Sequence, residues 1–341
     1  MRSVFRVFFR LFALLFLCAA VAAGFFYAWT TQALPVAPTS GNGAENSPVE
    51  FRIPPGSSLR GAVQAVNDAG VPLDADLFAL LARLQGQGGA IKAGSYVLSA
   101  GETAQTLLQK LVGGKVSQAS VTLVEGWTFR QFRARLDAQT TLLHDSQGMS
   151  EAEIARKLGL PHLEGRFLPD TYLFDKGSSD FDILRRAEHA MTRALAAAWQ
   201  ERPTNLPYKT VEEALIMASI IEKETGRPED RAHVAAVFVN RLRIGMRLQT
   251  DPTVIYGLGE AFDGNLRKIH LQTDTPYNTY TRGGLPPTPI AMPGMAALQA
   301  TFSPAESKAL YFVARGDGSS HFSRTLDEHN RAVNRYQRGR P

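Results

Sequence analysis

The chain opens with a run of apolar positions that no charged residue interrupts. Arg2, Arg6 and Arg10 precede this run, and the next charged residue is Glu45. At about 1.5 Å of rise per residue, a helix over residues 11–29 is long enough to cross the hydrocarbon core of a membrane. Because the arginines all lie before it, the positive-inside rule predicts a cytoplasmic N-terminus, residues 1–10, and export of the remainder.

Two other interpretations of this segment remain open. A cleaved signal peptide would also begin with arginines and end near small residues such as Ala20-Val21-Ala22. The apolar run continues through Phe25-Phe26-Tyr27, however, which favours an uncleaved anchor. A lipoprotein signal would need a small residue where Leu17 precedes Cys18. We therefore predict a single-pass inner-membrane protein whose bulk lies in the periplasm of a Gram-negative cell.

After the anchor, residues 30–48 are rich in Pro, Gly, Ser, Asn and Thr, which predicts a flexible linker. Residues 49–118 then alternate in a way typical of a small α+β module. The pattern predicts strands at 49–53 and 94–98 and helices from Ser58, over 74–84 and over 102–112. The stretch Ala93–Thr103 resembles a LysM-like glycan-binding domain. A structural spacer is the alternative.

Residues 119–341 are predicted to form a larger α+β domain. A strand is expected at 121–124, and helices are expected over 128–136, 150–158 and 180–202. The fold class expected for the whole chain is therefore α+β, with an N-terminal transmembrane helix, a small LysM-like module and a larger second domain.

The most informative pattern starts at Thr210, which forms a capping box with Glu213. From Ala214 to Ile221 the helix is apolar on every face except at Ser219, and a helix that is apolar all round is buried. Glu222 is the first acid after this stretch.

Glu222 shares a helix face with Ala218 and Leu215. An apolar wall disfavours the charged carboxylate and raises its pKa, as a general acid needs near neutral pH. The alternative is that the helix simply ends here and that Glu222 points into solvent. Glu224 lies on the opposite side of the helix, and we expect it and Glu212 to be solvated.

Polar, turn-rich segments with many aromatic and amide side chains follow this helix. They are Gln249–Gly257, Thr275–Tyr280 and Gly283–Ile290. Hydroxyl and amide groups bind sugar hydroxyls, and flat aromatic faces cover sugar rings, so these loops suit the lining of a glycan cleft. Ordinary Pro-rich surface turns are the alternative.

Composition narrows the function classes. The net charge of +5 is small for 341 residues, and Lys and Arg form no stripe, which argues against nucleic-acid binding. There is one cysteine, and no HExxH pair occurs, so we predict neither a metal site nor a cofactor. The basic tail is expected to be a solvated, frayed end: Arg331, Arg335, Arg338, Arg340.

Many stretches of the exported part, in order, closely resemble the endolytic murein transglycosylase (MltG or YceG-like) family. The matching stretches are 164–165, 167–172, 218–225, 237–242, 246–253, 277–280, 284–287, 311–314 and 321–322. Arg166 stands where the family is expected to have a bulky apolar or aromatic residue.

The resemblance implies an enzyme, a lyase, that cleaves the β-1,4 bond between N-acetylmuramic acid and N-acetylglucosamine within a strand. It implies 1,6-anhydromuramic ends, termination of strand elongation, a catalytic domain over residues 119–341, and Glu222 as the single acid/base. We expect the following residues to bind substrate: Gln249, Thr250, Asp251, Tyr256, Tyr277, Asn278, Tyr280.

Two alternatives to this function stay open. A hydrolase would pair Glu222 with Asp251 or Asp170, because hydrolysis usually takes two carboxylates. A non-catalytic scaffold would bind glycan without releasing product. The expected partners are peptidoglycan glycan strands and the inner membrane, and peptidoglycan synthases or divisome proteins are further candidates.

Overall fold

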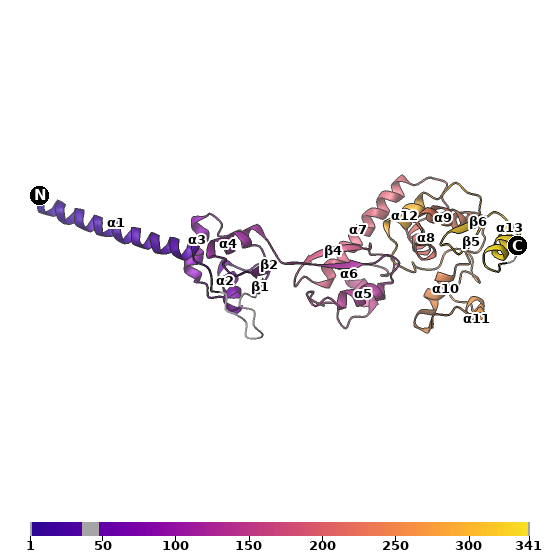
Figure 1. Cartoon of the computed structure of the whole chain (residues 1–341), viewed down its shortest axis with the longest axis horizontal. Coiled ribbons are helices and arrows are strands. Elements are labelled where there is room, and N and C mark those ends of the chain that lie inside the picture. The colour runs from indigo at the N-terminus through magenta and orange to yellow at the C-terminus, as the bar shows by residue number, and fades with distance from the viewer. Residues whose placement is uncertain (1, 36–47, 340–341) are drawn as a thin grey trace. The chain divides into compact units, whose positions relative to one another are not determined.

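The computed structural model describes residues 2–35 and 48–339, which fall into two compact units (Figure 1). Unit 1 comprises Met1–Ala119 and Leu173–Ser178, and unit 2 comprises Ser120–Tyr172 and Ser179–Pro341. Of the predicted linker, residues 36–47 lie outside the described part of the chain.

The N-terminal helix α1 spans Arg2–Thr31. Within the described residues, its segment Phe8–Thr31 is the one helix that is long and apolar enough to cross a membrane. It is compatible with a single-pass anchor, and its orientation stays a prediction. At its end Phe26 and Trp29 pack against the core of unit 1, and the Leu34 N–H donates to the Glu102 carbonyl at 2.7 Å.

In its described residues before Gln118, unit 1 contains two antiparallel strands and three short helices besides α1. They are β1 (Val49–Ile53), α2 (Leu59–Asp68), α3 (Ala75–Leu84), β2 (Gly94–Leu98) and α4 (Ala104–Gly113). Each of these helices begins at a side-chain cap, namely Ser58, Asp74 and Thr103. Alternate residues of β1 are buried, as expected of a strand with one face on the core. The predicted mixed α+β architecture is confirmed here.

Unit 2 is mainly helical. The strands β3 (Gln118–Leu123) and β4 (Asp170–Asp175) each cross a boundary between the units along the chain. The elements that lie wholly in unit 2 begin with α5 (Phe129–Asp137), α6 (Glu151–Leu158), α7 (Asp180–Glu201), α8 (Val211–Glu224) and α9 (Pro228–Arg243). They continue with α10 (Asp251–Leu258), η1 (Gly259–Ala261), α11 (Lys268–Gln272), α12 (Met295–Phe302), β5 (Tyr311–Ala314), β6 (Ser320–Ser323) and α13 (Leu326–Tyr336). β3 pairs with β4, and β5 pairs antiparallel with β6.

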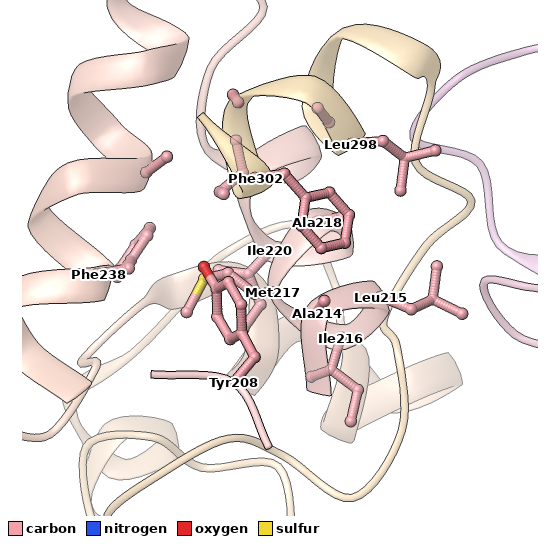
Figure 2. Close-up of a cluster of buried hydrophobic side chains, with 14 of the residues drawn as sticks. Tyr208, Ala214, Leu215, Ile216, Met217, Ala218, Ile220, Phe238, Leu298 and Phe302 are labelled. Atoms are coloured by element: carbon pink, nitrogen blue, oxygen red, sulfur yellow. The ribbon is translucent and has the colours of Figure 1, made fainter. Parts of the chain in front are cut away.

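The core of unit 2 is built around α8 (Figure 2). Thr210 caps this helix by accepting a hydrogen bond from the Glu213 N–H at 3.2 Å. All residues from Ala214 to Ile221 are buried, and the helix packs against α7, α9, α10 and α12. Burying each Leu, Ile or Met side chain contributes roughly 1.5–3 kcal/mol, so α8 stabilises the unit strongly. The buried helix predicted from the sequence is confirmed.

Two expectations about the second half of the chain were wrong. The segment Gln249–Gly257 is not only loop, because Asp251–Leu258 forms α10 with a proline in its first turn. Proline is tolerated there, since the first N–H groups of a helix have no partner within the helix. The basic tail is also not frayed throughout, because α13 is capped by Thr325 and continues to Tyr336.

Candidate active site

The C-terminal end of α8 carries two acidic side chains, Glu222 and Glu224. Residues two apart on an α-helix lie about 200° apart around its axis. The two carboxyl groups therefore face different surroundings, although both belong to the same helical turn.

Glu222 is half-buried against two loops. Its Oε2 accepts a hydrogen bond from the Gly294 N–H at 2.9 Å. Burial raises its pKa, an effect that the Gly294 hydrogen bond opposes and the nearby Glu125 carboxyl reinforces. The neighbouring Lys223 donates from Nζ to the Gly126 carbonyl at 3.1 Å. The direction of the pKa shift agrees with the sequence-based expectation.

Glu224 is half-buried too, so the expectation that it is solvated was wrong. The Thr250 hydroxyl donates a hydrogen bond to its Oε1. Burial raises the pKa of Glu224, and the negative charge of Asp251 adds to this, while the Thr250 hydrogen bond and Arg241 oppose it. The sequence pattern on α8 could not reveal the burial of Glu224, because the residue that covers its carboxyl, Thr250, comes from the segment before α10.

A cavity of about 610 Å³ adjoins Glu224. Its polar lining consists of Glu224, Arg241, Gln249, Asp251, Tyr280, His329 and Gln337. Its remaining lining comes from β5 and α13: Tyr311, Phe312, Val313, Ala314, Leu326, Val333. Glu222 is not part of this lining. The combination of convergent polar groups with an apolar wall is typical of small-molecule sites.

Arg241 supplies a buried positive charge to the cavity. It is 7% exposed, and it donates from Nε to the Leu310 carbonyl at 2.7 Å and from Nη1 to the Leu248 carbonyl at 2.5 Å. Burial lowers its pKa, yet a guanidinium stays protonated in proteins. We expected no role for Arg241 from the sequence. The sequence feature that could have indicated a role for Arg241 is its position on a helix that is buried over Val234–Val239.

The segment before α10 is held in an unusual conformation. Gln249 has a φ of 49°, which only a few per cent of non-glycine residues adopt. Thr279 fixes this segment, because its hydroxyl accepts from the Thr250 N–H at 3.0 Å and contacts the Thr253 hydroxyl at 2.9 Å. Such backbone strain persists where the surroundings enforce it, and it is common at functional sites.

The predicted substrate-binding residues separate into three groups. Gln249, Asp251 and Tyr280 line the cavity, and the Tyr280 hydroxyl donates to Asp251 Oδ1 at 2.5 Å. Thr250 is buried and reaches the cavity only through its hydrogen bond to Glu224. The remaining predicted residue positions lie outside the lining: Tyr256, Tyr277, Asn278.

Those outlying residues have partners of their own. Asn278 is 1% exposed, and its amide donates to the carbonyls of His270, Leu271 and Thr273. The Tyr277 hydroxyl contacts Thr288 at 2.8 Å, and its ring meets that of Tyr256 edge-on. These contacts join the loop around Asn278 to α10 and to the segment that contains Thr288.

Neither Asp170 nor a metal cluster belongs to this site. Asp170 is exposed, and its Oδ1 accepts from the Thr171 N–H at 2.7 Å. Across residues 2–35 and 48–339, no group of three or more His, Cys, Asp or Glu side chains is arranged to hold a metal ion.

Comparison with known proteins gives consistent similarities. The YceG-like family matches residues 51–335. The "Endolytic murein transglycosylase" of Bacillus subtilis is 32% identical over 307 residues, which cover 84% of each chain. The protein of the same name from Streptococcus pneumoniae is 28% identical over 94% of this chain, which spans 63% of that longer relative. A crystal structure of a YceG-like protein from Listeria monocytogenes superposes with a TM-score of 0.52 at 32% identity, covering 84% of this chain and 99% of that one.

Proposed function

Because the chain belongs to the YceG-like family, we propose that it is an endolytic murein transglycosylase, a lyase that cuts peptidoglycan glycan strands. The support is twofold. Curated relatives from two organisms carry this name, and the cavity beside α8 combines an acid of raised pKa with hydrogen-bonding and aromatic groups. The apolar helix α1 would anchor the enzyme in the inner membrane with its bulk outside the cytoplasm.

The reaction we propose is cleavage of the β-1,4 bond between N-acetylmuramic acid and N-acetylglucosamine. A protonated glutamic acid gives its proton to the bridging oxygen, and the bond from that oxygen to muramic C1 breaks. The resulting carboxylate removes the proton from the muramic C6 hydroxyl, whose oxygen bonds to C1. The product is a 1,6-anhydromuramic end, no water is consumed, and strand elongation ends there. The internal nucleophile benefits from proximity, so one carboxyl group suffices.

The geometry favours Glu224 over Glu222 for this role. Both acids have raised pKa values, but only Glu224 lines the cavity and meets Asp251, Arg241 and Thr250. The Thr250 hydroxyl orients its carboxyl, while Asp251, held by Tyr280, orients substrate hydroxyls. Glu222 remains the competing candidate from the sequence.

One observation supports hydrolysis as a second candidate reaction. Glu224 and Asp251 line the same cavity, and a pair of carboxyl groups is what glycoside hydrolysis usually uses. The two reactions leave different ends, because hydrolysis yields a reducing muramic end. A scaffold that only binds glycan would release no product.

Unit 1 is the second place where we propose glycan contact. The LysM-like stretch Ala93–Thr103 includes β2 and the cap of α4, so it belongs to the ordered body of the unit. The measurement that tests this contact compares how strongly sacculi bind the natural chain and variants of it with substitutions on the surface of unit 1. We also propose peptidoglycan synthases or divisome proteins as partners, because they act on the same nascent strands.

The experiment that tests the function uses the full chain in detergent with uncross-linked glycan strands and mass analysis of new ends. We expect anhydromuramic ends from the natural sequence. Glu224→Gln should reduce the rate roughly 10²- to 10⁴-fold, the range that loss of a general acid/base produces. Glu222→Gln tests the competing candidate two residues away, and its rate should stay within about tenfold of the natural one if Glu224 is the acid/base.

Other outcomes decide between the alternatives. Reducing ends would replace the lyase with a hydrolase. A rate that collapses only in Glu222→Gln would return the acid/base role to Glu222. Strand binding without any product would leave the scaffold interpretation.

A further inference from the structure

Glu164 is a buried carboxyl group that takes no part in the proposed reaction. It is 8% exposed and lies between α6 and β4. Its two oxygens accept from the Phe129 N–H at 3.2 and 3.3 Å, and Oε2 also accepts from the Tyr256 hydroxyl at 3.2 Å. A buried carboxyl is costly unless such donors satisfy it, so these contacts hold three segments together.

The surroundings of this carboxyl are apolar and rigid. Phe129 is the first residue of α5, and its ring packs on Phe167 with centroids 5.4 Å apart. Gly165 has a φ of 77°, and a Cβ there would lie 2.6 Å from Pro289. The backbone beside Glu164 is therefore closely enclosed.

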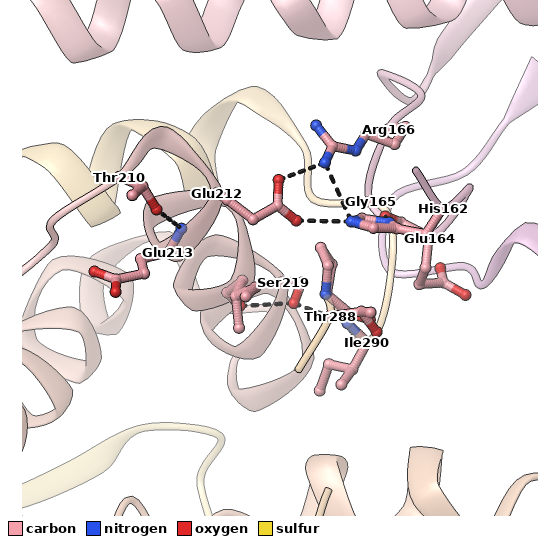
Figure 3. A network of polar contacts seen from close by, with 12 residues as sticks. His162, Glu164, Gly165, Arg166, Thr210, Glu212, Glu213, Ser219, Thr288 and Ile290 are labelled. Carbon is pink, nitrogen blue, oxygen red and sulfur yellow. Dashed lines mark hydrogen bonds and ion pairs between the residues drawn. The ribbon is translucent and has the colours of Figure 1, made fainter. Parts of the chain in front are cut away.

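A second network ties the same loop to the start of α8 (Figure 3). The His162 ring lies between the Glu164 carbonyl oxygen, 3.0 Å from Nδ1, and the Glu212 carboxylate, 2.8 Å from Nε2. Arg166 donates from Nη2 to Glu212 at 2.5 Å. The loop is thus joined to the helix that carries Glu224 at its other end.

α10 connects Glu164 with the cavity. Tyr256, which contacts Glu164, is in the second turn of α10, whereas Asp251 begins the helix and lines the cavity. Thr250, the residue preceding the helix, donates to Glu224. A helix of eight residues is not stable alone, so its position depends on contacts such as the one between Tyr256 and Glu164.

We propose that Glu164 is a positioning residue that, through the Tyr256 hydroxyl, holds α10 so that Thr250 and Asp251 meet Glu224 in the cavity. Burial raises the pKa of Glu164 to about 7, with the Phe129 and Tyr256 hydrogen bonds opposing that rise. The inference rests on the proposed function for its kinetic readout only.

The kinetic experiment compares three single variants and one double variant of the full chain on glycan strands. Tyr256→Phe and Glu164→Leu each remove the hydrogen bond, and we expect kcat to fall about tenfold while KM changes less than threefold. Glu164→Gln keeps an accepting oxygen and should stay within threefold of the natural sequence. The double variant Glu164→Leu/Tyr256→Phe should be no worse than Glu164→Leu alone, because Glu164→Leu already breaks the contact that Tyr256→Phe removes.

A matched control is Glu151→Gln, which removes an exposed charge that acts on both Glu164 and Tyr256 but leaves the hydrogen bond between them in place. It should leave kcat unchanged. A purely structural role for Glu164 would instead lower the unfolding midpoint with kcat per folded molecule intact, and that result would overturn the proposal.

Hydrogen exchange provides a readout that does not depend on activity. In Tyr256→Phe, the amides of α10 should exchange at least tenfold faster, while those of α9 should keep their natural rates. Unchanged exchange in α10 would overturn the positioning role even if the enzyme cuts strands. Faster exchange with no cleavage by the natural sequence would support the positioning role and reject the proposed function.

Discussion

Three carboxyl groups of unit 2 have pKa values raised by burial, and each has different partners. Glu222 accepts from a backbone N–H, Glu224 accepts from a hydroxyl, and Glu164 accepts from both kinds of donor. Because each hydrogen bond favours the charged form, these donors limit how far burial raises the pKa. At the residue scale, the pKa of each acid therefore depends on which hydrogen-bond donor reaches its carboxyl group.

Gln249 provides a prediction at this scale. Its φ of 49° is unfavourable for any side chain, so Gln249→Gly should raise the free energy of unfolding by roughly 1 kcal/mol. The variant also loses a cavity side chain, and strand cleavage should become slower. Urea unfolding and end-group analysis measure the two effects. Gln249→Ala is the control, since it removes the side chain but keeps the strain; equal stability of both variants would contradict the idea.

The helices of unit 2 differ in how much of their stability comes from their own sequence. α8 has a capped start and a long apolar run, and both are visible without any coordinates. α10 has eight residues and a proline in its first turn, and its contacts with Thr279 and Glu164 hold it in place. Helices this short depend on tertiary packing, so the sequence pattern alone predicts a loop where the structure has α10.

Ser219 provides a prediction for α8. Its hydroxyl donates to the Ile216 carbonyl at 2.7 Å in the core. It also accepts from the buried Ile290 N–H at 3.0 Å (Figure 3). Ser219→Ala leaves that buried N–H without a partner and should cost roughly 1–3 kcal/mol of unfolding free energy. The same change at the exposed Ser303 should cost less than about 0.5 kcal/mol. Similar losses in both variants would argue against the role of this bond.

At the scale of the whole molecule, the buried carboxyl groups connect stability to pH. A pKa of Glu164 near 7 in the folded state lies above the ordinary value of 4.5. The fold thus favours the neutral form of Glu164. Its contribution to the free energy of unfolding is therefore fully present below about pH 4.5 and is lost as the pH rises through about 7.

Replacing Glu164 should remove this dependence. Between pH 5 and pH 8, the decrease in unfolding free energy should be smaller in Glu164→Gln than in the natural sequence by roughly 3 kcal/mol at most. Glu212 is the opposing control, because the His162 hydrogen bond and the Arg166 charge outweigh burial and lower its pKa. Glu212→Gln should instead lose stability that is present above the ordinary pKa of a glutamate. Denaturant titrations at several pH values measure both.

The sequence by itself determined the apolar N-terminal helix, most elements up to α8, and the presence of an acid at the end of a buried helix. These features depend on caps and periodicity, which involve residues only a few positions apart. The tertiary structure alone decided what each acid meets, because Gly294 lies 72 positions from Glu222 and Thr250 lies 26 positions from Glu224. It also decided that Tyr256 does not line the cavity but contacts Glu164, which lies 92 positions away in the sequence. Contacts between such distant segments arise only when the core packs, and no local pattern encodes them.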